Sequence, residues 1–324
     1  MIQILEGYIH ILEEELVPSD IPLLSDPAII DYLEGHFIKL FEAIDTIRTV
    51  ATEQSKIVML LEASKQTGDF KAFTLALADA FSDLMKQSDD IKSGVLACVI
   101  FELEGQTYFG LLKLNFTTSY FHNVSMEAEK VSHQLSTRHT ALPSKSQRVS
   151  EALIINLETL ELFIRDKEIT VDGRKTSYLT EQILGLERRM SVKRTLDIVT
   201  KTPKDTAQPM QEVVQKAKIT QYVQKQLDEG APINVRAIAE ACFDSETERE
   251  AYESQVRSKG VFEETIEILP EQPVKVKETQ KIKTTSGVEI TLPAGYLAEE
   301  SNLEIAYETD GSMTIKLKHL GEIR

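Results

Sequence analysis

Eight arginine and lysine side chains gather between residues 174 and 204, and a row of such cations is suited to binding phosphate groups. They are Arg174, Lys175, Arg188, Arg189, Lys193, Arg194, Lys201 and Lys204. If the chain is helical here, Arg189 and Lys193 share a face because they are four residues apart, and Arg194 and Lys201 do so at seven. Double-stranded DNA carries one phosphate charge for about every 1.7 Å of its axis, so this row could bind it. The spacing is equally consistent with an exposed helix face whose cations pair with carboxylates of the acidic N-terminal part.

A second group of lysines lies near the C-terminus, at alternating positions of predicted strands. The group consists of Lys275, Lys277, Lys281, Lys283, Lys316 and Lys318. The first four have odd numbers, so one regular strand would place them on the same face, and the last two share a face of the final strand. They are a second candidate contact with DNA. Glu289 and Glu304 occupy polar positions on neighbouring strands, however, and pairing of lysine with glutamate across strands explains the pattern without any ligand.

The sequence contains none of the common catalytic motifs. It has no glycine-rich phosphate loop followed by Lys-Ser/Thr, no His-Glu-x-x-His, no Cys-x-x-Cys and no Gly-x-Ser-x-Gly. The six histidines are scattered, and His10, among apolar residues of a predicted strand, is expected to be a hydrogen-bonded core residue. Asp89-Asp90 and Glu13–Glu15 could hold a metal ion as in a nuclease, but nothing places a second carboxylate group beside either. We therefore predict no catalytic residue, no metal site, no cofactor and no enzymatic activity.

The composition is that of a folded chain with a strongly acidic balance. Of its 324 residues 42% are hydrophobic and 27% are charged, and the formal net charge is −16. Only the segment 173–230 is positive, with a net charge of +4. The net charges of residues 1–100, 101–172 and 231–324 are −10, −3 and −7. Such a chain is repelled by nucleic acid unless its cations are segregated, as they are here. The two cysteines, Cys98 and Cys242, suit a reduced cytosol, and neither a secretory signal nor a membrane span is expected, so we predict a cytoplasmic protein.

The N-terminal part is predicted to mix strands with helices. Asp26 followed by Pro27 predicts a helix start, because the carboxylate caps the first turn and proline lacks the amide hydrogen that would remain unpaired. A second helix is predicted to begin near Asp69. The polar residues 132–147 are expected to form an exposed connection. Buried strands are predicted over residues 2–11, 94–117 (as a hairpin), 152–157 and 162–169.

The middle of the chain is predicted to be helical, and the C-terminus to return to strands. Helices are predicted over residues 178–199, 210–227, 235–243 and 245–258. Ser245 and Glu248 match a reciprocal capping box, and Gly260 suits the left-handed residue that ends a helix. Residues 235–258 resemble a helix-turn-helix in outline, but the second helix is net-negative, which is wrong for a DNA groove, so we interpret the pair as ordinary packing. Asp310-Gly311 predicts a hairpin turn between strands at 303–307 and 313–318.

These elements predict an α+β fold, with an N-terminal mixed antiparallel sheet and helices, a helical middle and a small C-terminal antiparallel β sheet. We divide the chain into an α+β domain at residues 1–172, a basic helical segment at 173–262 and a β-rich domain at 263–324. The apolar hairpin and the terminal sheet both offer edges that a symmetric partner could cover, so we expect a homodimer.

Several short stretches follow one another in an order typical of one family. They are Tyr8-Ile9-His10-Ile11, Asp69-Phe70-Lys71-Ala72-Phe73, the hairpin at 94–116, Leu142-Pro143-Ser144-Lys145-Ser146-Gln147 ahead of Ala152-Leu-Ile-Ile-Asn, Tyr178-Leu179, and Lys259-Gly260-Val261. In this order the chain resembles the bacterial nucleoid-associated protein family over nearly its full length. The resemblance implies a cytoplasmic, nucleoid-located protein that binds double-stranded DNA with little sequence preference and has no known enzymatic activity. It supplies no residue-level DNA motif, so the candidate residues depend on their charge alone.

The leading hypothesis is a non-enzymatic nucleoid-associated protein that binds double-stranded DNA through phosphate contacts of its basic middle segment. The alternative is an acidic interaction or adaptor protein that docks partners in chromosome maintenance, plasmid systems or phage conflict. A metal-dependent nuclease is the least favoured function, because no metal-ligand spacing supports it.

Overall fold

The computed structural model describes residues 2–23, 26–43, 45–127, 130–171, 173–203, 209–268, 276–307 and 313–322. The chain forms two compact units, Met1–Arg189 and Met190–Arg324, each with its own hydrophobic core. The fold is α+β, as predicted. The division of the sequence at residues 172 and 262 stays a prediction, because compactness alone does not tell which segments fold independently.

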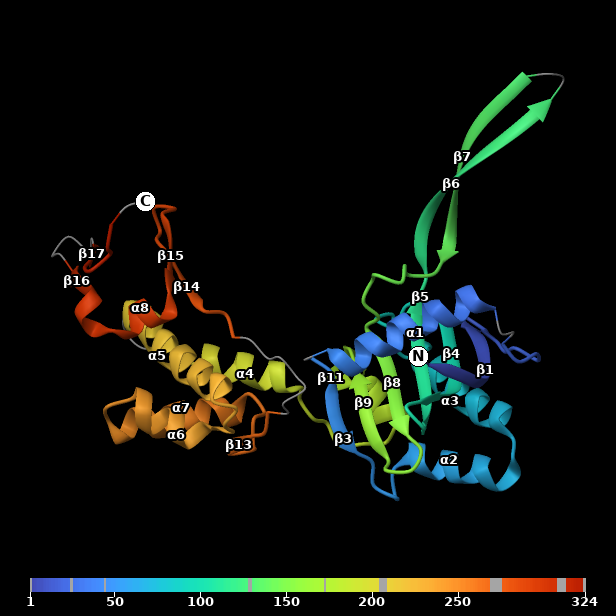
Figure 1. The fold of residues 1–324 in the computed structure, drawn as a ribbon, viewed down its shortest axis with the longest axis horizontal. Helices are drawn as coiled ribbons and strands as arrows, with labels where there is room; N and C mark the ends of the chain where they lie inside the picture. The colour runs from blue at the N-terminus through green and yellow to red at the C-terminus, as the bar shows by residue number, and fades with distance from the viewer. Residues whose placement is uncertain are drawn as a thin grey trace. The chain divides into compact units, whose positions relative to one another are not determined.

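An antiparallel sheet of seven strands, counted over the described residues, forms the centre of the first unit (Figure 1). In sheet order the strands are β2 (Leu16–Val17), β1 (Gln3–Leu12), β4 (Gly94–Leu103), β5 (Gln106–Asn115), β8 (Glu151–Asn156), β9 (Glu161–Arg165) and β3 (Ile47–Val50). β4 and β5 are the predicted apolar hairpin. β1 pairs with β4 and β8 pairs with β5, so this hairpin lies inside the sheet and has no free edge. The expectation that a partner covers its edge is therefore wrong.

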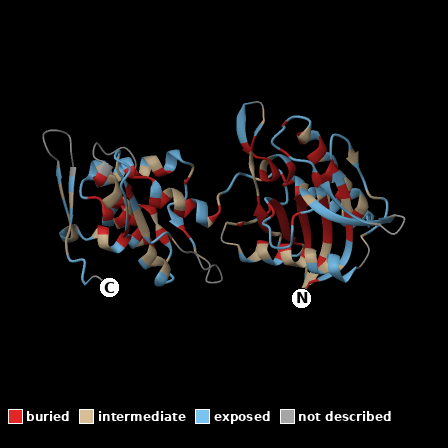
Figure 2. Ribbon diagram, turned by 90° about the horizontal axis from the view of Figure 1, so that it is seen from above, coloured by how far each residue is buried: buried red, intermediate tan, exposed pale blue. Residues whose placement is uncertain are grey.

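Helices cover both faces of this sheet. α1 (Pro27–Glu42) packs on one face, and α2 (Lys56–Thr67), α3 (Phe70–Met85) and a π-helix (Leu179–Ile183) pack on the other. Successive residues of β4 alternate between these two cores, with Val95 and Ala97 facing α1 and Leu96 and Cys98 facing α3. Burial on both faces explains why the hairpin reads as nearly continuous apolar sequence, and Figure 2 shows its strands as buried.

Two predicted helix starts are confirmed. The Asp26 carboxylate accepts a hydrogen bond from the Ala28 amide, and the Asp69 carboxylate accepts one from the Ala72 amide, each at 2.8 Å. Each carboxylate satisfies an amide that has no partner inside the helix. α2 was not predicted.

β6 (Thr117–Glu127) and β7 (Lys130–Ala141) leave the sheet and pair with each other as a two-stranded ribbon that extends away from it (Figure 1). The expectation of an exposed connection at 132–147 is wrong for residues 132–141, which are strand, although their side chains are exposed except at Ala141. A second, short hairpin follows, formed by β10 (Glu168–Val171) and β11 (Arg174–Ser177).

The prediction of one continuous helix over 178–199 is wrong, because two separate helices occupy parts of this range. The π-helix ends at Ile183, and Gly185 then adopts a left-handed φ of 66°, which a helix interior does not accommodate. A new helix, α4 (Val192–Lys201), begins after Ser191, whose hydroxyl accepts a hydrogen bond from the Arg194 amide at 3.3 Å. The segment between them is irregular.

The second unit combines helices with short antiparallel strand pairs. Besides α4 its helices are α5 (Pro209–Asp228), α6 (Val235–Cys242), α7 (Glu246–Ser258), α8 (Ala294–Ala298) and a 3₁₀ turn (Glu300–Asn302). Its strand pairs are β12 (Ile233–Asn234) with β13 (Thr265–Ile266), β14 (Thr279–Lys283) with β15 (Glu289–Pro293), and β16 (Leu303–Tyr307) with β17 (Met313–Leu317). The capping box of Ser245 and Glu248 and the left-handed Gly260, with φ 92°, are confirmed. The pairing of the last two strands is confirmed as well, while the turn at Asp310-Gly311 lies outside the described residues.

A small core holds the β14–β15 pair against α5. Ile282 and Leu292 from the strands and Leu297 from α8 pack with Met210 and Ala217 of α5. The polar side chains of β14 are therefore fixed beside the polar side chains of α5.

Candidate nucleic-acid interface

α4 presents a charged face to solvent and an apolar face to the rest of the second unit. Lys193, Asp197 and Lys201 follow one another at intervals of four residues, which places them on one side of the helix. On the other side Val199 is fully buried, and its carbonyl accepts a hydrogen bond from the Tyr252 hydroxyl of α7 at 3.1 Å. Packing therefore fixes the direction in which the lysines point.

A cavity of about 560 Å³ lies between α4, α5 and the β14 segment. The basic side chains that line it come from all three, and they are Lys193, Lys201, Lys216, Lys277 and Lys281. Asp197 is the one carboxylate among the lining residues that the structure describes. We call this cavity, with its five lysines, the lysine groove.

The walls of the lysine groove are tied together by a direct contact. The Gln280 side-chain amide on β14 donates a hydrogen bond to the Thr220 hydroxyl on α5 at 3.2 Å. Thr220 is buried, and its hydroxyl also donates to the Lys216 carbonyl at 2.7 Å. Both residues line the groove, so its shape depends on polar contacts as well as on the core beneath.

Three lysines of the groove have carboxylate partners. Lys201 pairs with Asp197 at 2.8 Å, and the other pairs are Lys216 with Glu212 and Lys281 with Glu289. The Lys201 and Lys281 pairs are exposed, and such pairs contribute about 0–1 kcal/mol, so phosphate oxygens can replace their carboxylates at little cost. The Lys216–Glu212 pair is partly buried. Lys193 and Lys277 are exposed and form no ion pair with any other residue that the structure describes.

The groove joins members of two groups that the sequence suggested separately. Lys193 and Lys201 belong to the first predicted group, and Lys277 and Lys281 to the second. Lys216 was not predicted, because its position four residues after Glu212 is that of an ordinary surface pair on a helix. The only available signal was its place in the positive segment 173–230.

The other members of the first group lie elsewhere. Arg174 and Lys175 are exposed on β11, and Arg188 and Arg189 are in the irregular segment before α4, all within the first unit. Arg188 forms an ion pair with Glu168. Arg194 is on α4 in the second unit. Because α4 begins only at Val192, Arg189 and Lys193 do not share a helix face as expected. Lys204 lies outside the described residues.

The C-terminal lysines pair across strands. Lys283 lies 2.7 Å from Glu289, and Lys318 and Lys316 lie 2.8 Å and 3.5 Å from Glu304. Hydrogen bonds from Lys281 and Lys283 lower the pKa of Glu289, and those from Lys318 and the charge of Lys316 lower the pKa of Glu304. The cross-strand explanation is confirmed for these four lysines. The single strand expected to hold Lys275–Lys283 is shorter than predicted, since β14 begins at Thr279, and Lys275 lies outside the described residues.

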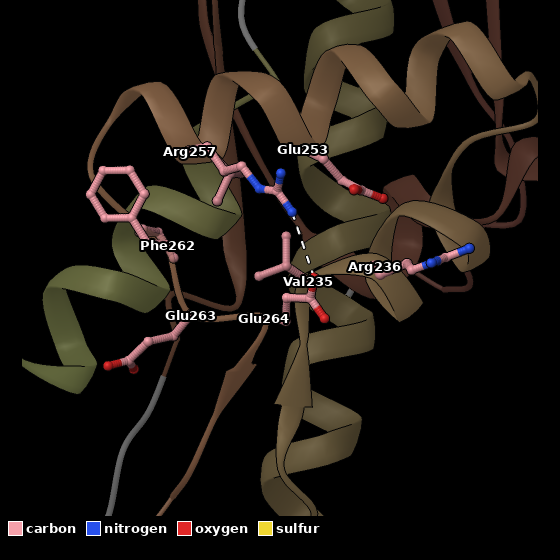
Figure 3. Close-up of a pocket in the computed structure, with 9 residues that line it drawn as sticks. Val235, Arg236, Glu253, Arg257, Phe262, Glu263 and Glu264 are labelled. Atoms are coloured by element: carbon pink, nitrogen blue, oxygen red, sulfur yellow. Dashed lines mark ion pairs between the residues drawn. The ribbon is translucent and has the colours of Figure 1, made fainter.

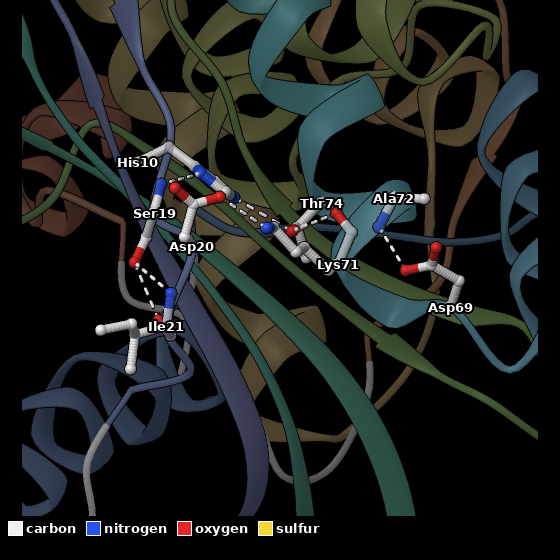
Figure 4. Close-up of polar contacts among 8 residues, drawn as sticks. All are labelled: His10, Ser19, Asp20, Ile21, Asp69, Lys71, Ala72 and Thr74. Carbon is white, nitrogen blue, oxygen red and sulfur yellow. Dashed lines mark hydrogen bonds and ion pairs between the residues drawn. The ribbon is translucent and has the colours of Figure 1, made fainter.

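His10 is a hydrogen-bonded core residue, as predicted (Figure 4). The Ser19 amide donates to its Nδ1 at 3.2 Å, so Nε2 carries the proton and donates to the Thr74 hydroxyl at 3.0 Å. The Thr74 hydroxyl in turn donates to the Lys71 carbonyl. Burial, with the nearby Lys71 charge, lowers the pKa of His10. The imidazole is neutral and structural.

The acidic clusters have structural surroundings. Asp90 accepts a hydrogen bond from the Thr170 amide at 3.0 Å, and Glu13–Glu15 lie in the bend between β1 and β2. Over the described ranges, no three histidine, cysteine, aspartate or glutamate side chains come together to hold a metal ion. Each helix in those ranges is too short or too polar to cross a bilayer.

A second cavity of the same unit lies between α6, α7 and the segment before β13 (Figure 3). Its volume is about 20 Å³, room for roughly one water molecule. Its charges are mixed, with Arg236 and Arg257 beside three glutamates, and Arg257 pairs with Glu264 at 3.6 Å. The size and the mixed charge make it a poor site for a polyanion.

The comparisons with known proteins give one result that covers almost the whole chain. A family model described as nucleoid-associated protein YejK matches residues 6–318. No curated protein matches the chain.

Proposed function

Because the chain belongs to the nucleoid-associated protein YejK family, we propose that it binds double-stranded DNA through phosphate contacts and that the lysine groove is the binding surface. The observation that carries the proposal is the convergence of five lysines from three separate segments, of which Lys193 and Lys277 have no ion-pair partner among the described residues. In a chain with a net charge of −16, such a local excess of cations is what a polyanion requires.

The residue types of the groove favour binding without sequence preference. Lysine contacts phosphate as a point charge on a flexible stem and lacks the rigid fork by which arginine makes two parallel hydrogen bonds to guanine. No arginine lines the groove among the described residues. Contacts with phosphates fix the position of a protein on DNA but carry no sequence information.

The proposal includes the wider set of predicted contacts. Arg174, Lys175, Arg188, Arg189 and Arg194 are candidates for further phosphate contacts, together with Lys204, Lys275, Lys283, Lys316 and Lys318. The proposed activity is binding without catalysis or cofactor, in the cytoplasm and on the nucleoid. Chromosome-maintenance proteins and a second copy of the chain are the proposed protein partners.

The proposal is tested by charge reversal in the groove. The double variant K193E/K277E removes the two lysines for which no ion pair is described. We expect its affinity for a duplex oligonucleotide, measured by fluorescence anisotropy at about 0.1 M salt, to fall at least tenfold, since several like charges then face the phosphates.

The matched control makes the same charge change elsewhere in the second unit. Lys225 and Arg236 are exposed, are not part of the groove, and pair with Glu229 and Glu240. The affinity of the variant K225E/R236E for DNA should therefore stay within about threefold of that of wild type. The small loss reflects the change in overall charge alone. Equal losses in the two variants, or none in K193E/K277E, would contradict the proposal. Absence of DNA binding by the folded wild-type chain would favour the acidic adaptor instead.

A further inference from the structure

The β6–β7 ribbon has one face that is apolar and uncharged. In an antiparallel pair, residues opposite each other lie on the same face, and the faces alternate along each strand. The register therefore places Tyr120, His122, Val124 and Met126 of β6 on one face with Thr137, His133, Leu135 and Val131 of β7. We call these eight residues the apolar face of the ribbon. None of them is an aspartate, glutamate, lysine or arginine.

The apolar face is open to solvent in the single chain. The exposed fractions are 77% for Tyr120, 60% for Val124, 74% for Met126, 55% for Val131 and 80% for Leu135. A two-stranded ribbon with such a surface is marginally stable in water unless something covers it. A contiguous exposed apolar surface of this kind typically marks an interaction site.

The polar atoms of the apolar face are partly satisfied within the face itself. The His122 and His133 rings are stacked at 5.0 Å between centroids, and His122 Nε2 and His133 Nδ1 share a hydrogen bond of 2.8 Å. Desolvation of the centre of the face therefore leaves fewer unpaired polar atoms.

The opposite face of the ribbon has a different character. Its side chains bond to one another, with the Asn123 amide donating to the Ser136 hydroxyl at 2.7 Å and Ser125 bonded to Ser132 at 2.6 Å. The Arg138 guanidinium lies 5.4 Å from the centre of the Phe121 ring. Such a face gains little from leaving water, so docking is confined to the apolar face.

We propose that the apolar face of the ribbon is a homodimer interface, in which the ribbons of two copies pack face to face. The absence of charged side chains on this face indicates which partner covers it. The face contains no lysine or arginine, so it lacks the local excess of cations that nucleic acid and anionic lipid both require. A second apolar face without charge is its complement, and the same ribbon in another copy supplies one.

The geometry and area fit a two-fold symmetric dimer. In a two-fold arrangement the same surface serves both copies. When the axis crosses the ribbons at right angles, the two ribbons run antiparallel to each other. If each of the five large side chains buries about 100 Å², two copies together bury about 1,000 Å², the lower limit for a specific interface. The centre of the face lies between the rows His122–Leu135 and Val124–His133, so Leu135 lies next to the symmetry axis.

The experiment measures the oligomeric state of the full chain without DNA, so that its result is independent of the lysine groove. Sedimentation equilibrium of the wild type up to about 100 µM should show a monomer–dimer equilibrium. The variants L135E and L135K each place two like charges near the axis, and the dissociation constant should rise about 100-fold. An equimolar mixture of L135E and L135K should recover the dimer, because the charges then complement each other.

The neighbouring residue provides a matched control. Gln134 is exposed on the same strand but belongs to the opposite face, so Q134E and Q134K should dimerise as the wild type does. At a concentration where the wild type is monomeric, all four variants should keep its melting temperature, because these side chains lie outside the core. A wild type that stays monomeric, including one that binds neutral phosphatidylcholine vesicles instead, overturns the proposal. The proposal is also overturned if L135E dimerises as the wild type does, or if Q134E weakens the dimer as much as L135E does.

Discussion

Lys113 is a charged residue with no access to solvent, on β5 at the centre of the first unit. Its ammonium donates hydrogen bonds to the Lys92 carbonyl and to the Asn115 side chain, and the Asn115 amide donates to the buried Glu151. The Tyr178 hydroxyl donates to the other oxygen of Glu151 at 3.2 Å. This buried network joins β5 and β8 to the π-helix. No hydropathy pattern predicts it, because a lysine at an inward position of a strand looks like a break in the alternation.

Burial lowers the pKa of Lys113 to about 8, and the charge of Glu151 opposes this shift. Between pH 8 and the unfolded value of about 10.4 the unfolded chain binds more protons, so stability should rise with pH across this window. The variant K113M has no titrating group at this position, so its stability lacks this contribution from the lysine. Relative to K113M, the wild type should gain about 2 kcal/mol between pH 8 and 10, at 1.36 kcal/mol per pKa unit.

The measurement is the melting temperature of wild type and K113M by circular dichroism across this pH range. From pH 8 to pH 10, the melting temperature of wild type should rise by about 4–8 °C relative to that of K113M. The thiol and tyrosine groups that titrate at high pH are common to both proteins and cancel in the difference. If the two melting temperatures change with pH in parallel, the pKa of Lys113 is the same in the folded and unfolded chains, and the prediction is wrong.

Among the elements, those with local capping signals were the most predictable. Asp26, Asp69 and the Ser245–Glu248 box were recognised because each has a side chain that caps a helix within a few residues. α4 was merged into a longer helix because Gly185 and Ser191 were not recognised as a helix end and a helix start.

The β6–β7 ribbon was not predicted, for another reason. From His122 to Met126 the residues of β6 alternate in character as a strand requires, but Phe121 interrupts the alternation and β7 is mostly polar. A strand whose faces are both exposed lacks the strong apolar pattern on which strand prediction depends. Likewise, the lysine groove could not be assembled from sequence, because tertiary packing brings β14 beside α5.

The cap of α4 should control both stability and the position of Lys193. Replacing Ser191 with alanine leaves the Arg194 amide without its partner, which costs about 1 kcal/mol, or roughly 2–4 °C in melting temperature. DNA affinity should fall as well, because the first turn of α4 carries Lys193. S191N keeps an acceptor and should restore both. An unchanged melting temperature in S191A would contradict this role of the cap.

At the scale of the whole molecule, cationic and uncharged surfaces occupy different units of an acidic chain. The lysine groove belongs to the second unit and the apolar face of the ribbon to the first. A dimer formed through the ribbons would carry two grooves and could therefore hold two DNA segments at once. Linking two sites in this way raises the apparent affinity without any new contact.

This arrangement predicts that the protein bridges DNA duplexes. Wild type should capture a fluorescent duplex onto beads that carry a second duplex, and L135E should lose the capture while keeping its affinity for a single duplex. Q134E is the control and should bridge as wild type does. Bridging that persists in L135E would show that the ribbon is not what joins the two binding sites.

The most direct test of the central claim is the salt dependence of duplex binding. Each phosphate neutralised by a lysine contributes about −0.9 to the slope of log K against log salt, so five groove lysines predict a slope of about −4 to −5. For the variant K193Q/K201Q/K277Q/K281Q the magnitude of the slope should fall by about 3.6, which is about 0.9 for each lysine removed. A variant that keeps the wild-type slope would show that DNA is held elsewhere on the molecule.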